Sequence, residues 1–170
     1  MSSKVIIFDT SVLCCWLQVP GKDTCGPESD RWNFKRIEQK ISEELEAGST
    51  FVLPLATIME TGNHIAFAPG DKYSLAQSLS QYIRKAATDT DPWAAFGHQA
   101  ELWRAEKLIK LAESWPELAV QGLGIGDTTI KDVADYYAST SAIEVEILTG
   151  DKGLKSYQPT SQVPKPRRRR

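Results

Sequence analysis

The chain of 170 residues has few of the residues on which several kinds of chemistry depend. Its three cysteines, Cys14, Cys15 and Cys25, lack the paired spacing of a zinc or redox motif, so we interpret them as small hydrophobic residues. It has two histidines and no nucleophile elbow, which argues against serine or cysteine hydrolase chemistry. The glycines at positions 122, 124 and 126 do not follow the GxGxxG spacing of a nucleotide-binding loop. No apolar run approaches the length of a membrane-spanning helix, so we expect no membrane association.

Charge is distributed unevenly along the chain. The formal net charge is −2, but the last ten residues carry five basic residues and no acid, which leaves 15 basic and 22 acidic residues elsewhere. An acidic body does not favour a broad electrostatic grip on nucleic acid. It suits a protein that meets phosphate through a metal ion, or one that offers a basic tail to an acidic partner. The N-terminus becomes apolar too early for a secretory signal, so we expect a cytoplasmic location.

Short apolar runs alternate with helical patterns along most of the chain. Strands are predicted at residues 5–8, 51–53 and 145–149. Helices are predicted over residues 12–17, 29–47, 55–67, 72–87 with Asp71 as the cap, 99–113 and 128–139. This alternation predicts a helix-rich α/β fold, an α/β/α sandwich around a mostly parallel central sheet. We expect one domain over residues 1–157 and a Pro-rich, basic tail over residues 158–170 that is disordered or serves interaction.

Four acidic residues stand where predicted elements begin or end. Asp9 follows the first strand and Asp151 follows the third, whereas Glu60 lies in the helix after the second strand and Asp127 lies at a helix start. Ligands of an open parallel sheet bind at the carboxyl ends of its strands, so we expect these carboxylates to converge on one edge. Clustered carboxylates repel one another unless a cation joins them, and hard oxygen donors select Mg²⁺ or Mn²⁺. The sequence therefore predicts a metal site that can activate water for attack on a phosphodiester.

The acids also have ordinary structural interpretations. Asp127 could serve only as a helix N-cap, and Asp151 only as a turn residue in Gly-Asp-Lys-Gly. Asp9 is harder to explain in this way, because burying a lone carboxylate at the end of an apolar strand costs several kcal/mol. The prediction of a metal site therefore depends on the four acids taken together.

Two nearby residues have alternative roles. His64 lies four residues after Glu60 on the same helix face, and it either meets substrate or Glu60 or makes an ordinary polar contact. Lys131 lies one turn after Asp127, and it either neutralises that acid, meets a substrate phosphate or forms an i,i+4 ion pair on its own helix. Both are candidates for substrate contact.

In four segments the sequence resembles the PIN-domain nucleases, in the order found in that family. The segments are residues 6–13, 54–63, 126–130 and 147–152, and the resemblance extends over residues 4–157. It implies a PIN-like fold and Mg²⁺- or Mn²⁺-dependent endoribonuclease activity on RNA. It also implies, as in many members, the role of toxin in a VapC-type toxin–antitoxin pair, with an antitoxin partner and a homodimer as expectations.

The resemblance assigns roles to individual residues. By this likeness Asp9, Glu60, Asp127 and Asp151 are the catalytic acids, and they hold the metal and its attacking water. The hydroxyl groups of Thr10, Ser11 and Thr149 would orient carboxylates or phosphate around them. The chain also departs from the family, because a Pro-rich segment follows residue 157 where a further strand is common, and because residues 88–121 are longer than a minimal toxin needs.

Three other functions compete with this interpretation. A phosphatase of the haloacid dehalogenase type also begins with strand and Asp, but it needs a second Asp at the position that Ser11 occupies here. A structure-specific DNA nuclease would share the acidic site. A catalytically silent PIN-like module would act by binding alone.

Overall fold

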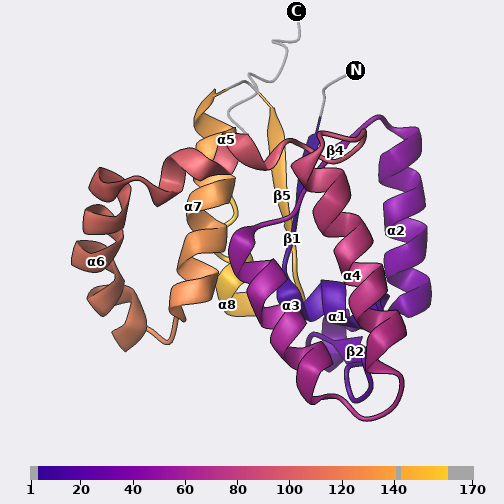
Figure 1. Cartoon of the computed structure of the whole chain (residues 1–170). Helices are drawn as coiled ribbons and strands as arrows, with labels where there is room; N and C mark the ends of the chain where they lie inside the picture. Colours follow the sequence, from indigo (N-terminus) through magenta and orange to yellow (C-terminus); the bar gives the residue numbers. More distant parts are fainter. Residues whose placement is uncertain (1–3, 141–142, 161–170) are drawn as a thin grey trace, which may run out of the picture.

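The computed structural model describes residues 4–140 and 143–160. These residues form a three-stranded parallel sheet flanked by helices, shown in Figure 1, so the predicted α/β class and the parallel sheet are confirmed. The strands are β1 (Lys4–Phe8), β4 (Thr50–Val52) and β5 (Glu144–Leu148), in the order β4-β1-β5. This arrangement is compatible with the predicted α/β/α sandwich.

The helices take up most of the remaining chain. They are α1 (Thr10–Trp16), α2 (Phe34–Glu46), α3 (Leu55–Phe67), α4 (Lys72–Ala87), α5 (Phe96–Ala100), α6 (Ala105–Val120), α7 (Ile125–Thr140) and α8 (Lys152–Lys155). Two 3₁₀ turns, η1 (Glu28–Asp30) and η2 (Glu101–Trp103), and a small antiparallel pair, β2 (Thr24–Cys25) with β3 (Trp32–Asn33), complete the described elements. None of the described helices is long and apolar enough to cross a membrane.

Strand β1 is the centre of the fold, and successive residues on it face opposite sides. Ile6 and Phe8 belong to a hydrophobic cluster with apolar residues of α1, α2 and α4. Val5 and Ile7 belong to a second cluster, which includes residues of α7 and α8. Helices therefore cover both faces of the sheet, which explains why β1 is apolar throughout residues 5–8. The buried strand delivers Asp9 to the end of the sheet with little freedom to move.

Two predicted helices are confirmed closely. Helix α3 has the predicted bounds, and α4 begins after Asp71, whose side chain accepts a hydrogen bond from the Ser74 backbone N–H. The start of α3 is held by Gln99, a buried residue that bonds the backbone on both sides of Pro54. These contacts fix the helix that carries Glu60.

Three predicted helix boundaries are wrong. The helix expected from residue 29 begins at residue 34, because Asn33 caps it by accepting from the Arg36 N–H while residues 28–33 form η1 and β3. The pattern over 99–113 is divided at Arg104, whose extended backbone separates η2 from α6, and α6 then continues through Pro116. Helix α7 begins three residues earlier than expected, since Gly124 accepts the first helical hydrogen bond from Thr128.

The predicted tail begins inside the described part of the chain. Gln158 Oε1 accepts a hydrogen bond from the Ile147 N–H at 2.9 Å, so the start of this segment packs along β5. The rest of the predicted tail, residues 161–170, lies outside the described residues.

Candidate active site

Four carboxylates from four separate parts of the chain line one pocket at the carboxyl ends of β1 and β5. In Figure 1 the starts of α1, α7 and α8 gather with α3 around this end of the sheet. The pocket has a volume of about 290 Å³ and is lined by Asp9, Thr10, Ser11, Cys14, Lys22, Cys25, Glu60, His64, Asp127 and Asp151. The predicted convergence of the four acids is therefore found in the structure.

Asp9 is the most constrained of the four acids. It is 4% exposed, and its Oδ2 accepts hydrogen bonds from Ser11 Oγ at 2.7 Å and from Thr149 Oγ1 at 2.6 Å. No residue in the described part of the chain donates to Oδ1 of Asp9. One carboxylate oxygen is thus fixed by hydroxyl groups, and the other remains for a ligand in the pocket.

The hydroxyl groups of Thr149 and Ser11 link the segment around Asp9 to the segment around Asp151. Thr149 Oγ1 donates to Asp9 and accepts from the Asp151 N–H at 2.9 Å. Ser11 Oγ likewise accepts from the Gly150 N–H at 3.1 Å. Asp151 also caps α8, with its Oδ1 accepting from Gly153 N–H at 2.6 Å. The turn interpretation of Asp151 is therefore correct as geometry, and the same residue still lines the pocket.

Glu60 enters the pocket where α3 passes α7. Its Oε2 accepts a hydrogen bond from Thr10 Oγ1 at 2.9 Å. A Cβ atom at Gly126 would overlap Oε1 of Glu60, so a larger residue there would displace the Glu60 carboxylate from its present position. The glycine-rich segment before Asp127 therefore makes room for an acid on another helix.

The pKa of Asp127 is shifted by its burial and by the charges of the other three acids. Burial raises the pKa of Asp127, and repulsion from Asp9, Asp151 and Glu60 raises it further, to about 6. The residue lies in the first turn of α7, inside the helix, so the interpretation as an N-cap is wrong. A carboxylate held among like charges is one that a cation would stabilise.

The predicted neighbours of the acids have different positions. His64 lines the pocket beside Glu60. Lys131 does not line it, because its Nζ lies 2.8 Å from Asp135 Oδ2 and 3.7 Å from Asp132 Oδ1. The geometry of Lys131 is therefore that of the i,i+4 ion pair, directed away from Asp127.

Three pocket residues were not predicted from the sequence. Lys22 is the one lysine or arginine among the described residues that line the pocket, and Cys14 and Cys25 supply its thiols. Burial raises the pKa of the Cys14 thiol to about 11 and also raises the pKa of the Cys25 thiol, so both stay protonated at neutral pH and are poor nucleophiles. Cys25 reaches the site through the two-residue strand β2, which is too short to produce a recognisable pattern.

The residue types of the pocket fit a hard divalent cation, although the side chains are not gathered around one point. Four carboxylates with hydroxyl neighbours form the oxygen-rich donor set that Mg²⁺ and Mn²⁺ prefer. Within residues 4–140 and 143–160, however, no group of three or more His, Cys, Asp or Glu side chains is arranged to hold an ion. Carboxylates repel one another without a cation, and hydroxyl and amide groups here satisfy them separately. Binding of an ion by three or more of these residues would require the side chains to move closer together.

Size does not distinguish this pocket from others on the surface. Three further pockets have volumes of about 350, 520 and 390 Å³. The acidic pocket is distinguished by the charge and the placement of its residues.

Comparisons of the chain with protein-family models, with curated proteins and with solved structures find no match.

Proposed function

We propose that this protein is a metal-dependent endoribonuclease of the PIN-domain type, which hydrolyses RNA at the pocket formed by Asp9, Glu60, Asp127 and Asp151. The observation that carries the proposal is the convergence of these four acids, far apart in sequence, in a single pocket with one lysine on its wall. The elevated pKa of Asp127 supports it, because structural acids are usually paired with cations or kept in water.

Each residue has a defined task in this proposal. Mg²⁺ or Mn²⁺, when bound, supplies the Lewis acidity that activates water and offsets charge on the phosphodiester. Asp9 would hold the ion with the help of Ser11 and Thr149, whose hydroxyl groups fix its Oδ2. Thr10 orients Glu60, and Asp127 and Asp151 complete the set of carboxylates that line the pocket. His64 and Lys22 stand where they can meet a substrate phosphate.

A silent binding module of the same fold is the second candidate. The observation that favours it is that no three of the potential ligands among the described residues are arranged around an ion. Both candidates have the same acidic pocket, so they differ only in whether a cation draws the carboxylates together. A structure-specific DNA nuclease would share the chemistry and differ in substrate.

Cleavage of a labelled single-stranded RNA, with Mn²⁺, with Mg²⁺ and with chelator, tests the proposal. The wild-type protein should cut with either ion and stop with chelator, and Asp127→Asn should reduce the rate at least about a hundredfold. Asp135→Asn is the matched control, since Asp135 is an exposed acid on the same helix that pairs with Lys131 outside the pocket. Equal rates for wild type and Asp127→Asn would exclude the proposal. Cleavage of structured DNA in preference to RNA would favour the DNA nuclease.

The toxin role and its partners are a further part of the proposal. The resemblance to VapC-type toxins leads us to expect a cytoplasmic protein that slows growth when expressed, is relieved by an antitoxin and pairs as a homodimer. Expression of wild type and of Asp127→Asn in the same host tests this, because growth arrest by the wild type alone would connect the arrest to the acidic pocket.

A further inference from the structure

One face of α3 carries three chemically different side chains in a row. Glu60, His64 and Phe67 are spaced by four and three residues, which places them on the same side of the helix. The first two line the acidic pocket, and Phe67 is the last residue of the helix. From Glu60 to Phe67 the helix rises about 10 Å, the length of about three nucleotides at the stacked spacing of ~3.4 Å.

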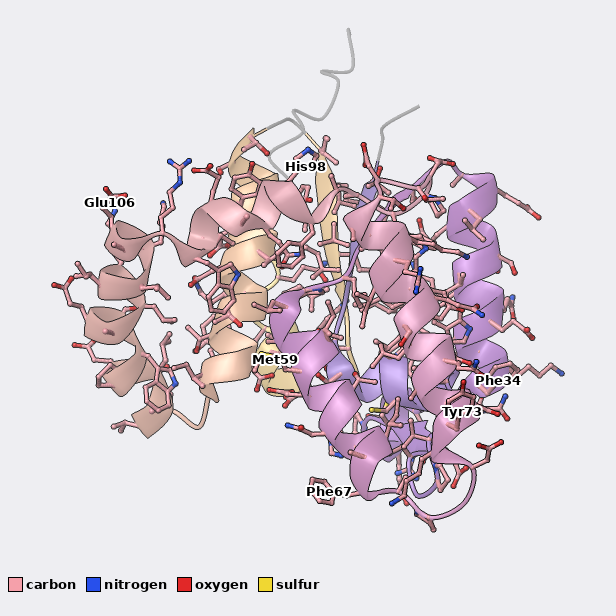
Figure 2. The ribbon with its side chains drawn as sticks, in the orientation of Figure 1. Phe34, Met59, Phe67, Tyr73, His98 and Glu106 are labelled. Carbon is pink, nitrogen blue, oxygen red and sulfur yellow. The ribbon has the colours of Figure 1, made fainter. Side chains whose placement is uncertain are left out.

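Phe67 lines a second pocket that adjoins the acidic one. This pocket, with a volume of about 390 Å³, is lined by Val19, Pro20, Lys22, Asn63, His64, Phe67, Ala68 and Pro69. Lys22 and His64 line both pockets, so the two are adjacent. Phe67 is 88% exposed, and Figure 2 shows it projecting beyond the end of α3. An aromatic ring this exposed contributes little to the core.

The chemistry of the second pocket matches one nucleotide of a single strand. An aromatic ring and two prolines offer flat apolar surface for a base, and Lys22, which forms no ion pair with another described residue, offers a cation for the phosphate beside it. A duplex keeps its bases stacked inside, so this surface can be used only by an unpaired base.

We infer that Phe67 is a stacking platform for an unpaired RNA base within about three nucleotides of the phosphate at the acidic site. Lys22 and His64 span the boundary between this base subsite and the acidic pocket. The inference rests on the proposed function in that it names the single-stranded substrate of the same site. It predicts selectivity for single-stranded over duplex RNA.

Binding and cleavage of fluorescein-labelled single-stranded RNA test the inference. Binding is measured by anisotropy with Mg²⁺ in the Asp127→Asn background, so that cleavage does not interfere. Phe67→Ala should weaken binding about 5- to 100-fold and Phe67→Trp should retain it, because a ring is what stacks. Phe67→Leu should weaken it nearly as much as Phe67→Ala. In the active protein, Phe67→Ala should raise KM with little change in kcat.

Tyr73→Ala is the matched control, since Tyr73 is 74% exposed on α4 and lies apart from Phe67 in Figure 2. It should leave binding unchanged. Duplex RNA, and single strands in which the bases are replaced by abasic sites, should bind wild type and Phe67→Ala equally. An unchanged melting temperature for Phe67→Ala would establish that its fold is intact.

Several results would overturn the inference. Wild-type affinity in Phe67→Leu, equal affinity of the wild type for duplex and single-stranded RNA, or no binding of single-stranded RNA at all would each do so. Sedimentation showing a wild-type dimer, a Phe67→Ala monomer and equal RNA affinity would assign the surface to a second copy of the chain. Phe67-dependent binding without any cleavage would instead contradict the nuclease proposal and leave the base subsite standing.

Discussion

Acidic side chains lie at both ends of β1, but they are paired with lysines only at its amino end. At its amino end, Lys4 Nζ lies 2.9 Å from Glu44 Oε1 and 2.5 Å from Glu146 Oε2, and Lys40 contacts the same two acids at 2.6 and 3.0 Å. At its carboxyl end, Asp9 accepts hydrogen bonds from two hydroxyl groups and shares a pocket with three other acids and one lysine, and no described acid of the pocket forms an ion pair. The same strand thus connects a compensated cluster to an uncompensated one.

The direction of the pKa shifts separates the two clusters. Burial alone would raise the pKa of Glu44, but hydrogen bonds from Lys40, Ser49 and Lys4 outweigh it and lower the value to about 2. At the other end, burial and repulsion both raise the pKa of Asp127, to about 6. Paired charges of the first kind serve structure, and unpaired charges of the second kind are a cost of folding that a ligand can remove.

Removing Lys4 should have the largest effect on stability. Lys4→Met leaves Glu44 and Glu146 with only part of their compensation, so we expect the free energy of unfolding to fall by about 2–3 kcal/mol, less than for a fully buried pair because Lys40 remains. Urea denaturation measures this. The double variant Lys4→Met, Glu146→Gln should recover part of the loss. A Lys4→Met protein with wild-type stability would show that the ion pairs of Lys4 do not stabilise this end of β1.

Adding a divalent cation should stabilise only the acidic end. At ten to a hundred times its dissociation constant, Mn²⁺ contributes about 1.4 to 2.7 kcal/mol, which raises the melting temperature of a chain of this size by about 3 to 10 °C. Thermal shift with Mn²⁺ and Mg²⁺ measures it. The increase should be lost in Asp127→Asn and kept in Lys4→Met. A melting temperature that ignores both ions would favour the silent module.

Changing pH should affect the two ends in opposite directions. Stability from Glu44 is present above its unfolded pKa near 4.5 and is lost as pH falls towards 2. Asp127 binds its proton more tightly in the folded state, so stability is lost as pH rises from about 4 to 6. Asp127→Asn should therefore stabilise the metal-free protein more near pH 7.5 than near pH 4, by about 1 kcal/mol after allowance for solvent screening. Urea midpoints at the two pH values measure the difference, and an equal effect at both would contradict the repulsion.

The strands and the acids at their ends were predictable for local reasons. The apolar run before Asp9 and the similar run before Asp151 are typical of buried parallel strands, and α3 has proline and glycine signals at its ends. Their roles in binding or catalysis remain predictions. The start of α7 was predicted wrongly because Gly126 suggested a flexible approach, whereas it accommodates Glu60 from α3.

Contacts between distant residues could not be predicted in the same way. The i,i+4 spacing of Lys131 and Asp135 made their ion pair one of the alternatives, but nothing local indicates that the two-residue strand β2 brings Cys25 against Gly150. The acidic pocket and the pocket around Phe67 share Lys22 and His64, which are 42 positions apart in the chain. These features arise from packing between elements.

The sequence by itself determined the α/β alternation, the buried character of β1 and the placement of acids beside element ends, because periodicity and capping act over a few residues. Only the tertiary structure decided which acids face one another, which lysines compensate them and which aromatic ring stays outside the core. Those outcomes depend on the direction of side chains from elements that meet only after folding, and electrostatic interaction depends on distance in space rather than along the chain.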